Sequence, residues 1–487
     1  MTLASKLKSA AFWQTLQIVI QVVAQFAYIA TMARLLSKND FGLMAMAGSF
    51  IGIGTIFSEG GMGAALIQRK NITQKHMNAA LQGGFVIGFA IFIMLFFSAN
   101  IIALFFNQPQ LEFLIKVIGV NVVLHSISGI SISLLEKEFQ FKYTASITMV
   151  TSVIGYTVGI LCGYHNLGVW SLVVASLTTT LLSTIAFFSF APIKFSFKLH
   201  VKEWKELFSF GFGIILLKIN NYMGNEGIIL VLGKIFTPGL LGVFERAFRI
   251  KTLPSMYLGN ILDKIMFPAM SEIQDEHDRL FRIYQNSLGV VNSVLMPLAV
   301  FLVFFSKEVV LIILGNNWLE AVFPLQIMFI VLPFSSSSRM ADSVIRAKGL
   351  VYKNSLRKFI YVIFLLVTVS IGAYYFGIVG ASIAVSISFL FNYTIMLVLV
   401  KRIFNKGIRE IFFSPVFAGL KISLVILIII YIFSKILNGL NETPLSNFFI
   451  ISLFTCVLIA FIAWKNPKML GKYLCGTINQ VFIKTKS

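Results

Sequence analysis

The feature that most constrains the fold is the recurrence of long apolar segments along almost the whole chain. Each segment holds about 20 or more mainly apolar residues, the length that a helix needs to cross about 30 Å of hydrocarbon. Hydrophobic residues make up 57% of the 487 residues and charged residues 12%, with a mean hydropathy of +0.88. A water-soluble protein of this length could not bury so much apolar surface. The sequence therefore predicts an all-α integral membrane protein.

We predict about fourteen transmembrane helices from the lengths of these segments. Their approximate ranges are 11–33, 41–67, 79–106, 111–135, 143–164, 168–190, 207–233, 238–262, 283–305, 319–345, 356–376, 378–400, 414–434 and 446–464. The first segment is too long for a cleaved signal peptide, so we expect it to remain as the first crossing. Because the predicted number is even, both termini are expected on the same side of the membrane.

The distribution of Lys and Arg indicates which side that is. With both termini in the cytoplasm, the cytoplasmic segments hold 28 of the 40 Lys and Arg residues, and the opposite loops hold 5. Those five are Arg34, Lys38, Lys234, Lys307 and Lys435. Cationic segments resist translocation, so this bias favours cytoplasmic termini. The formal charge of +21 then follows from membrane topology, and we expect no nucleic-acid partner.

Several chemistries lack any signature. Cys162, Cys456 and Cys475 show no disulfide or metal-ligand spacing, and no metal site is expected. The sequence contains no P-loop, so we expect no cofactor and no ATP hydrolysis by this chain. Any energy that the chain uses to transport a molecule would then come from an ion gradient, of H⁺ or Na⁺, or from downhill use of the carrier that bears the molecule. The external loops are short, which disfavours an enzyme that needs an outer catalytic domain.

An internal repeat divides the chain. Shifting the sequence by 200 positions places Arg34-Leu35-Leu36-Ser37 on Lys234-Ile235-Phe236-Thr237, and Phe41-Gly42 on Leu241-Gly242. Six helices in each copy give both copies the same orientation, related by an axis along the membrane normal. We expect two pseudo-symmetric six-helix lobes with a cargo site between them. The predicted domains are lobes at 1–200 and 201–410, two further helices at 411–465 and a cytoplasmic tail at 466–487.

Two apolar spans carry polar residues spaced three or four positions apart, which places them on one helix face. We interpret these stripes as the lining of a cavity, although hydrogen bonds to neighbouring helices are an alternative. The first stripe holds Gln14, Gln17, Gln21, Gln25 and Tyr28, and the second holds Lys218, Asn221, Tyr222, Asn225 and Glu226.

Cations within spans are candidates for contacts with an anionic cargo, because unpaired charge is excluded from the bilayer centre. We favour Lys218, Arg246 and Arg249 as contacts to a diphosphate or a sugar acid, with Lys116 and Arg339 as weaker candidates. The candidates for protonation or coupling are Glu59 and Glu226. A loop carboxylate beside Arg69 and Lys70 is the simpler interpretation of Glu59. Pro333, followed by four serines, predicts a bend in its span.

Several short motifs occur in a characteristic order along the chain. They are Arg34-Leu35-Leu36-Ser37-Lys38-Asn39-Asp40-Phe41-Gly42, Gly63-Ala64-Ala65-Leu66-Ile67-Gln68-Arg69, Leu134-Leu135 with Phe139 and Phe141-Lys142, Leu167-Gly168-Val169-Trp170-Ser171-Leu172-Val173, Phe267-Pro268, Leu314-Gly315 with Trp318, and Ala347-Lys348-Gly349. Their order and spacing resemble Wzx-type polysaccharide flippases of the MOP superfamily, which has a MATE-like fold. Glu59 stands where an aspartate is expected in that family, and the stretch around Glu226 does not align cleanly.

The resemblance implies a cargo and a location. The expected cargo is an oligosaccharide on undecaprenyl diphosphate, moved from the inner to the outer leaflet of a bacterial cytoplasmic membrane for surface polysaccharide export. Expected partners are this lipid-linked oligosaccharide, membrane lipids and other polysaccharide-assembly proteins. The alternatives are a peptidoglycan-precursor flippase or a cation-coupled drug exporter of the same superfamily, a membrane glycosyltransferase or polymerase, and a scaffold that transports nothing.

Overall fold

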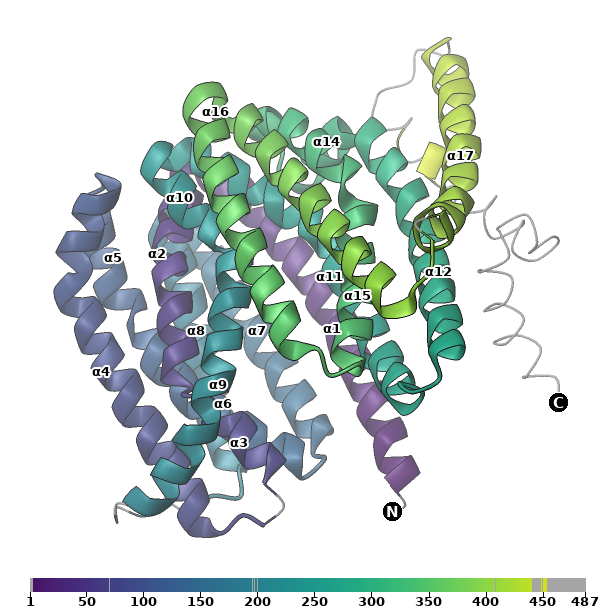
Figure 1. Ribbon diagram of the computed structural model, residues 1–487. Helices are drawn as coiled ribbons and strands as arrows, with labels where there is room; N and C mark the ends of the chain where they lie inside the picture. Colours follow the sequence, from purple (N-terminus) through teal and green to yellow (C-terminus); the bar gives the residue numbers. More distant parts are fainter. Residues whose placement is uncertain are drawn as a thin grey trace. The chain divides into compact units, whose positions relative to one another are not determined.

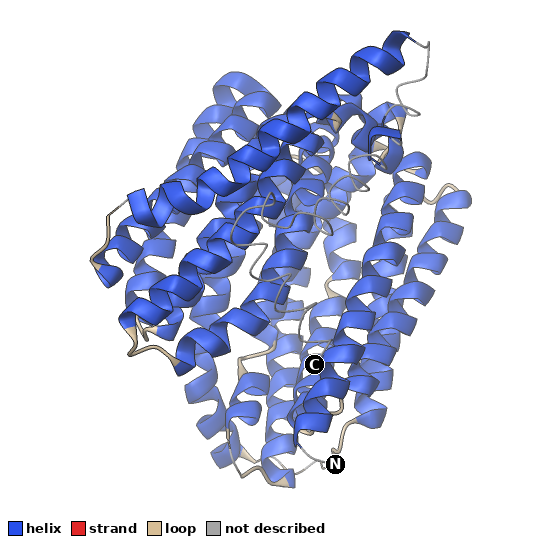
Figure 2. Ribbon diagram, turned by 90° about the vertical axis from the view of Figure 1, so that its right-hand side faces the viewer, coloured by secondary structure: helices blue, strands red, loops and turns tan. Residues whose placement is uncertain are grey.

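The computed structural model describes residues 3–69, 71–194, 196, 198, 200–407, 409–439, 448 and 450–452. All regular secondary structure within these residues is helical (Figures 1 and 2). The chain forms two compact units, which comprise residues 1–243 with 313–317, and residues 244–312 with 318–487. The predicted lobes follow the sequence repeat instead of this division, so their boundaries stay a prediction.

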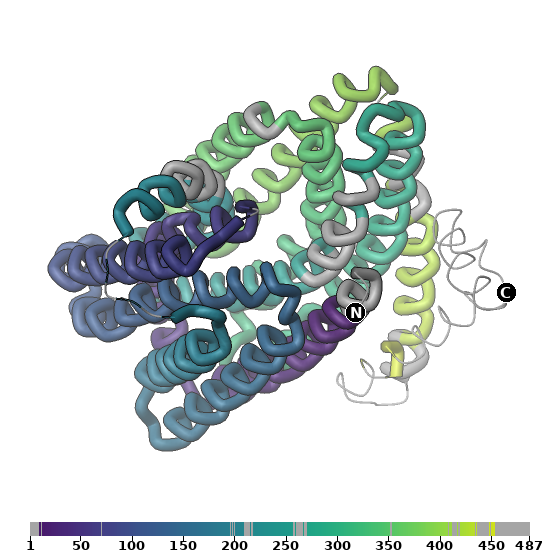
Figure 3. Tube along the Cα trace, turned by 90° about the horizontal axis from the view of Figure 1, so that it is seen from below, coloured from purple at the N-terminus to yellow at the C-terminus, as the bar shows by residue number. Residues whose placement is uncertain are grey.

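The first unit is built from ten helices and the start of an eleventh, and Figure 3 shows it from below in purple to teal. Among them, α6 packs against α2, α3, α4, α7 and α8. The helices are α1 (Leu3–Leu35), α2 (Lys38–Ser58), α3 (Met62–Gln68), α4 (Gln74–Phe106), α5 (Gln110–Ile118), α6 (Val120–Lys137), α7 (Phe141–Tyr164), α8 (Val169–Phe190), α9 (Val201–Asn225) and α10 (Gly227–Ile235).

The second unit holds most of the remaining helices, and α12 packs against α14, α15 and α17 within it. The helix α11 begins in the first unit and continues into the second. The helices are α11 (Pro238–Glu272), α12 (His277–Phe304), α13 (Ser306–Ile313), η1 (Asn316–Ala321), α14 (Val322–Ile330), α15 (Leu332–Ala347), α16 (Val351–Phe404), η2 (Arg409–Phe413) and α17 (Ser414–Gly439).

The helices confirm the predicted membrane protein. In the described part of the chain, eight helices are long and apolar enough to cross a membrane, or nine with one bent pair counted as a span. Every predicted span up to residue 434 overlaps a helix or a pair of helices. Most of the span at 446–464 and the tail at 466–487 lie outside the described residues.

Three helix breaks have local causes in the sequence. Gly60 and Gly61 take positive φ between α2 and α3, a conformation that glycine adopts without steric cost. Gly377 has φ 58° inside α16 and separates the two predicted spans that α16 contains. A bend of 45° separates η1 and α14 from α15, where Pro333 occupies the first turn of α15. The predicted interruption near Pro333 is therefore confirmed.

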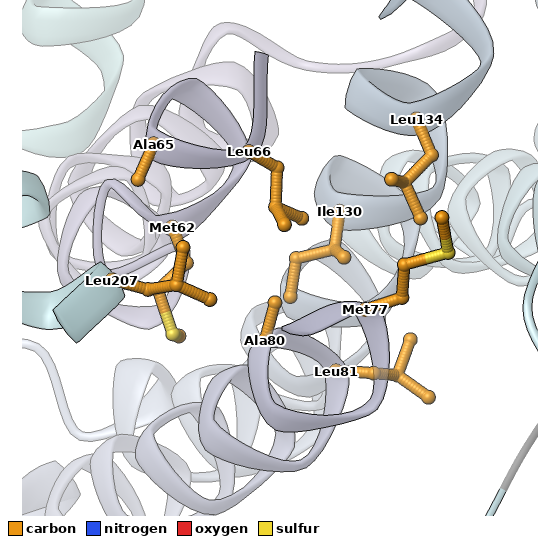
Figure 4. Packing of buried hydrophobic residues seen from close by; sticks show 9 residues of the cluster. All are labelled: Met62, Ala65, Leu66, Met77, Ala80, Leu81, Ile130, Leu134 and Leu207. Atoms are coloured by element: carbon orange, nitrogen blue, oxygen red, sulfur yellow. The ribbon is translucent and has the colours of Figure 1, made fainter. Parts of the chain in front are cut away.

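A buried apolar cluster holds four helices of the first unit together (Figure 4). It joins α3, α4, α6 and α9, and Leu66, Ala80 and Met62 are fully buried in it. Burying such side chains contributes roughly 1.5–3 kcal/mol for each large one. The cluster consists of Met62, Ala65, Leu66, Met77, Ala80, Leu81, Ile130, Leu134 and Leu207. It fixes the short helix α3 beside α9, next to the polar residues considered below.

Candidate functional site

The polar stripe predicted on α1 partly packs against protein. Tyr28 stacks on Tyr156 of α7 with ring centroids 4.5 Å apart. Gln17 donates a hydrogen bond to Gln21 within the helix at 3.3 Å. All five residues of the stripe, including Gln14 and Gln25, are intermediate in exposure. The stripe is therefore a real helix face, and its role as a cavity lining stays a prediction.

The polar residues of α9 divide between two faces. Lys218 and Tyr222 face α2, where the Tyr222 hydroxyl donates to the Ser49 carbonyl oxygen at 2.7 Å. Asn221 and Asn225 are exposed, and the Asn225 side chain donates to the Asn221 carbonyl oxygen at 3.1 Å. The asparagine face is thus the more exposed of the two faces.

Lys218 forms an ion pair with Glu59. The sequence predicts separate roles for the two, with Lys218 as a cargo contact and Glu59 as a candidate for protonation or coupling. Glu59 lies between α2 and α3, and Lys218 lies on α9. The two side chains are 34% and 43% exposed, so water reaches the pair. A Cβ on Gly129 of α6 would lie 3.4 Å from Cγ of Glu59, so the carboxylate packs close to that helix. Glu226 caps the junction between α9 and α10.

Arg246 and Arg249 share one carboxylate on α11. Glu245 is 2% exposed, and its two oxygens lie 2.5 Å from Nε of Arg246 and 2.6 Å from Nε of Arg249. Two guanidinium groups against one carboxylate leave a formal positive charge. Arg249 is 49% exposed, so water reaches its side chain, and the roles of Arg246 and Arg249 as cargo contacts stay a prediction.

Lys116 has a local explanation. Its ammonium lies 2.6 Å from Glu112, one turn earlier on α5, and 5.3 Å from the ring centroid of Phe96. An ion pair at this spacing and a cation–π contact are ordinary features of helix packing. The structure therefore offers a structural account of Lys116, while its weaker role as a cargo contact stays a prediction.

The second unit contains a group of cations that the sequence interpretation largely missed. We call it the cationic cluster: Lys251 on α11, Arg339 and Arg346 on α15, and Arg357 and Lys358 on α16. Lys251 is 1% exposed, with its ammonium 3.6 Å from the ring centroid of Phe389. A Cβ on Gly259 would lie 2.6 Å from the Arg339 guanidinium, which places Arg339 against α11.

The acid within this cluster is Asp342. Arg346 lies 3.1 Å from Asp342 and Arg357 lies 3.7 Å from it, while the Asn354 amide donates to it at 2.7 Å. Arg357 also donates to the Asn392 side chain. Lys358 lies within electrostatic range of Asp342, Arg339, Arg346 and Arg357. Three cations of the cluster therefore lie around Asp342, and Arg339 and Lys251 interact with each other beside them.

Two features of the sequence explain why the cluster was missed. Lys251 sits within an apolar span, but no neighbour in the sequence marks it as buried. The Lys and Arg distribution counts Arg346, Arg357 and Lys358 among the cytoplasmic cations, although the last two fall at the start of the predicted span 356–376. The helix α16 begins at Val351, so Arg357 and Lys358 are already two turns into it. A charge two turns inside a helix next to an apolar span was the available signal.

The cluster also contains hydroxyl groups. Ser255 on α11 and Ser336 on α15 lie 2.8 Å apart at their hydroxyl oxygens, and both are buried. Because a hydroxyl can donate or accept, this pair can satisfy itself or bind a sugar or phosphate oxygen. No group of three or more His, Cys, Asp or Glu that could hold a metal ion occurs among the described residues.

Comparison with solved structures confirms the predicted fold. The inward closed conformation of the lipid II flippase MurJ matches with a TM-score of 0.72 and 16% identity, over 98% of this chain and 99% of that chain. An inward-facing MATE family multidrug resistance transporter of the MOP superfamily matches with a TM-score of 0.66 and 14% identity, over 81% and 98%. The chain therefore has the MOP-type transporter fold.

Comparison with curated relatives points the same way. The lipopolysaccharide biosynthesis protein WzxC of Escherichia coli K12 is 24% identical over 444 residues, 90% of each chain. The teichuronic acid biosynthesis protein TuaB of Bacillus subtilis 168 is 21% identical over 350 residues, 72% of each chain. The polysaccharide biosynthesis protein family matches residues 31–323. The resemblance noted in the sequence is thus confirmed, and this multi-pass membrane protein belongs to the polysaccharide biosynthesis protein family.

Proposed function

We propose that this protein is a flippase. It moves oligosaccharide units carried on undecaprenyl diphosphate from the inner to the outer leaflet of the bacterial cytoplasmic membrane, by alternating access. Family membership, the fold and the named roles of relatives such as the succinoglycan biosynthesis transport protein ExoT support this proposal. The distribution of Lys and Arg supports a topology with both termini in the cytoplasm.

The observation that carries the proposal is the cationic cluster. A diphosphate cannot enter hydrocarbon without compensating charge, because an unpaired buried anion is very unfavourable. The buried Lys251 beside Arg339 is unfavourable for the same reason unless an anion binds near it. The cluster extends from the predicted cytoplasmic ends of α15 and α16 to Lys251 within α11. A diphosphate that loads from the cytoplasmic leaflet would meet these cations first.

The cluster also favours this cargo over the alternatives. An exporter of cationic drugs requires membrane acids, whereas Arg346, Arg357 and Lys358 gather around Asp342 here. A peptidoglycan-precursor flippase would carry the same diphosphate, so the relatives named for polysaccharide pathways favour the oligosaccharide. We further propose that the chain performs no covalent chemistry, that H⁺ or Na⁺ is its coupling ion, and that polysaccharide-assembly proteins are partners.

The test is export in cells that lack the chromosomal gene. We expect Arg339→Gln to insert normally, to abolish surface polysaccharide and to cause lipid-linked repeat units to accumulate inside. Lys307→Gln, which removes an exposed cation from the first turn of α13, should leave export unchanged. Normal export by Arg339→Gln would reject the role of the cluster. Sugar transfer catalysed by the purified wild-type protein would reject the flippase proposal and favour a transferase.

A further inference from the structure

A second basic site, made of residues other than the cationic cluster, lines a pocket of about 360 Å³ within the second unit. Its polar lining comes from four side chains at helix ends: His277, Lys348, Lys353 and Arg402. His277 begins α12, Lys348 follows α15, Lys353 lies in the first turn of α16, and Arg402 lies in its last turn. None of the residues that line the pocket belongs to the cationic cluster.

The remaining lining is apolar and comes from the same helix ends. Ile345, Leu350, Leu399 and Ile403 form it. The two halves of α16 run in opposite directions on either side of Gly377, so residues 350–353 and 399–403 lie at the same end of this helix pair (Figure 1). Cationic heads beside an apolar lining at one end of a helix pair match the boundary between headgroups and acyl chains.

The pocket carries a formal positive charge without an acid in its lining. The two acids adjacent to His277 in the sequence pair with cations outside the lining, because Asp278 lies 3.5 Å from Lys406 and Glu276 lies 3.2 Å from Arg279. Lys348 lies 3.3 Å from Nε2 of His277, so the imidazole orients this ammonium without neutralising it. Three cations thus converge on a space that no carboxylate of the lining occupies.

We propose that this pocket binds the phosphodiester headgroup of an anionic phospholipid from the cytoplasmic leaflet. Lys348, Lys353 and Arg402 would contact the phosphate oxygens, and the acyl chains would follow the apolar lining toward the membrane. Its volume suits a glycerophosphate headgroup, since small-molecule sites begin near 300 Å³. A free phosphate shares the anionic chemistry but gains nothing from the four apolar residues, so the lining favours a lipid.

The position of the pocket connects helix ends that are distant in the sequence. Its lining comes from the start of α12, the end of α15 and both ends of α16. A bound headgroup would hold these ends together and stabilise the second unit. Anionic lipid should therefore raise the thermal stability of the purified protein.

The test uses the purified full-length chain and native mass spectrometry with phosphatidylglycerol or phosphatidylethanolamine as the probe. We expect wild type to retain phosphatidylglycerol in preference to phosphatidylethanolamine. The triple variant Lys348→Ala, Lys353→Ala and Arg402→Ala should bind phosphatidylglycerol about 100-fold more weakly, at about fivefold for each cation. A control triple variant, Lys205→Ala, Lys401→Ala and Arg409→Ala, removes the same charge from exposed positions outside the pocket.

Each other outcome rejects the proposal. An equal loss in the control triple variant would mean a general attraction of anionic lipid to basic surface. Equal retention of both lipids by wild type would mean that the pocket does not distinguish an anionic headgroup from a zwitterionic one. Displacement of phosphatidylglycerol by excess inorganic phosphate would assign the pocket to a soluble anion. Should the pocket triple variant fail to fold, Arg402→Ala against Lys401→Ala makes the same comparison at adjacent positions.

Discussion

Gly42 on α2 and Gly242 on α11 each face the backbone at the start of the other's helix. A Cβ on Gly42 would lie 1.7 Å from the Pro238 carbonyl oxygen, and one on Gly242 would lie 2.2 Å from the Lys38 carbonyl oxygen. Positions 38 and 238, like 42 and 242, differ by the shift of 200 that aligns the repeat. The contact is therefore reciprocal, as a two-fold relation between the copies requires.

The residues around this crossing obey the same relation. Ser37 caps α2 through a hydrogen bond with Asp40, and Thr237 accepts from the Leu240 backbone N–H at the start of α11. Arg34 donates to the Ile313 carbonyl oxygen at 3.4 Å, and Lys234 donates to the Phe105 carbonyl oxygen at 2.6 Å. Arg34 and Lys234, which correspond in the repeat, thus each bind a carbonyl in the other copy.

We predict that Gly42→Val strongly destabilises the protein. The added side chain would overlap the Pro238 carbonyl, and overpacking of this kind costs about 1–3 kcal/mol or more. Gly48→Ala on the same helix is the matched control, because nothing lies within 4 Å of a Cβ there. The measurement is thermal unfolding of the purified protein in detergent. Equal stability of the two variants would contradict the close helix crossing.

Removing the Lys234 ammonium should loosen the same region by less. Lys234→Met loses one hydrogen bond to a backbone carbonyl, for which we expect a loss of about 1 kcal/mol. Lys435→Met removes another external cation, from α17, and should change the unfolding temperature little. A Lys234→Met protein as stable as wild type would show that the contact with Phe105 contributes nothing.

Variants of the ion pair between Glu59 and Lys218 can show whether Lys218 only stabilises the fold or also binds cargo. We expect Lys218→Met and Glu59→Gln each to destabilise the protein, because each leaves a partly buried charge without its partner. The double variant should recover part of that stability, with a coupling of about 1–3 kcal/mol. If Lys218 contacts cargo, the double variant will still fail to export polysaccharide. Restored export would mean that Lys218 serves only to neutralise Glu59.

Acidification should weaken one contact at the predicted cytoplasmic face. The hydrogen bond from Arg69, 2.6 Å away, lowers the pKa of Glu206 below its ordinary value of 4.5. The carboxylate therefore stabilises the folded state above pH 4.5, and this contribution is lost as the pH falls through the lower folded pKa. Glu206→Gln should flatten this dependence of the unfolding temperature, while Glu203→Gln should not. If the unfolding temperatures of wild type and Glu206→Gln depend on pH in the same way, Glu206 does not make this contribution.

The fold was largely predictable, because hydropathy and helix length act locally. The positive φ at Gly377 separates two spans that the sequence already divided at 376 and 378. The ion pair between Glu59 and Lys218 was not predictable, since its partners are 159 positions apart and neither is marked by the repeat. The burial of Lys251 was also hidden, because burial depends on which helices surround α11.

Lys251 provides the sharpest test of whether buried charge in this protein is retained for function. Replacing a buried cation with an apolar residue of similar volume is often neutral or stabilising by about 1–4 kcal/mol. We therefore expect Lys251→Met to fold with an equal or higher unfolding temperature but to lose polysaccharide export. Lys251→Arg keeps the positive charge and should retain more export than Lys251→Met. If Lys251→Met exports normally, the lysine is not needed for cargo. If Lys251→Met is strongly destabilised, the contact of Lys251 with Phe389 is structural, because the lysine then stabilises the surrounding helices and is not retained for binding an anion.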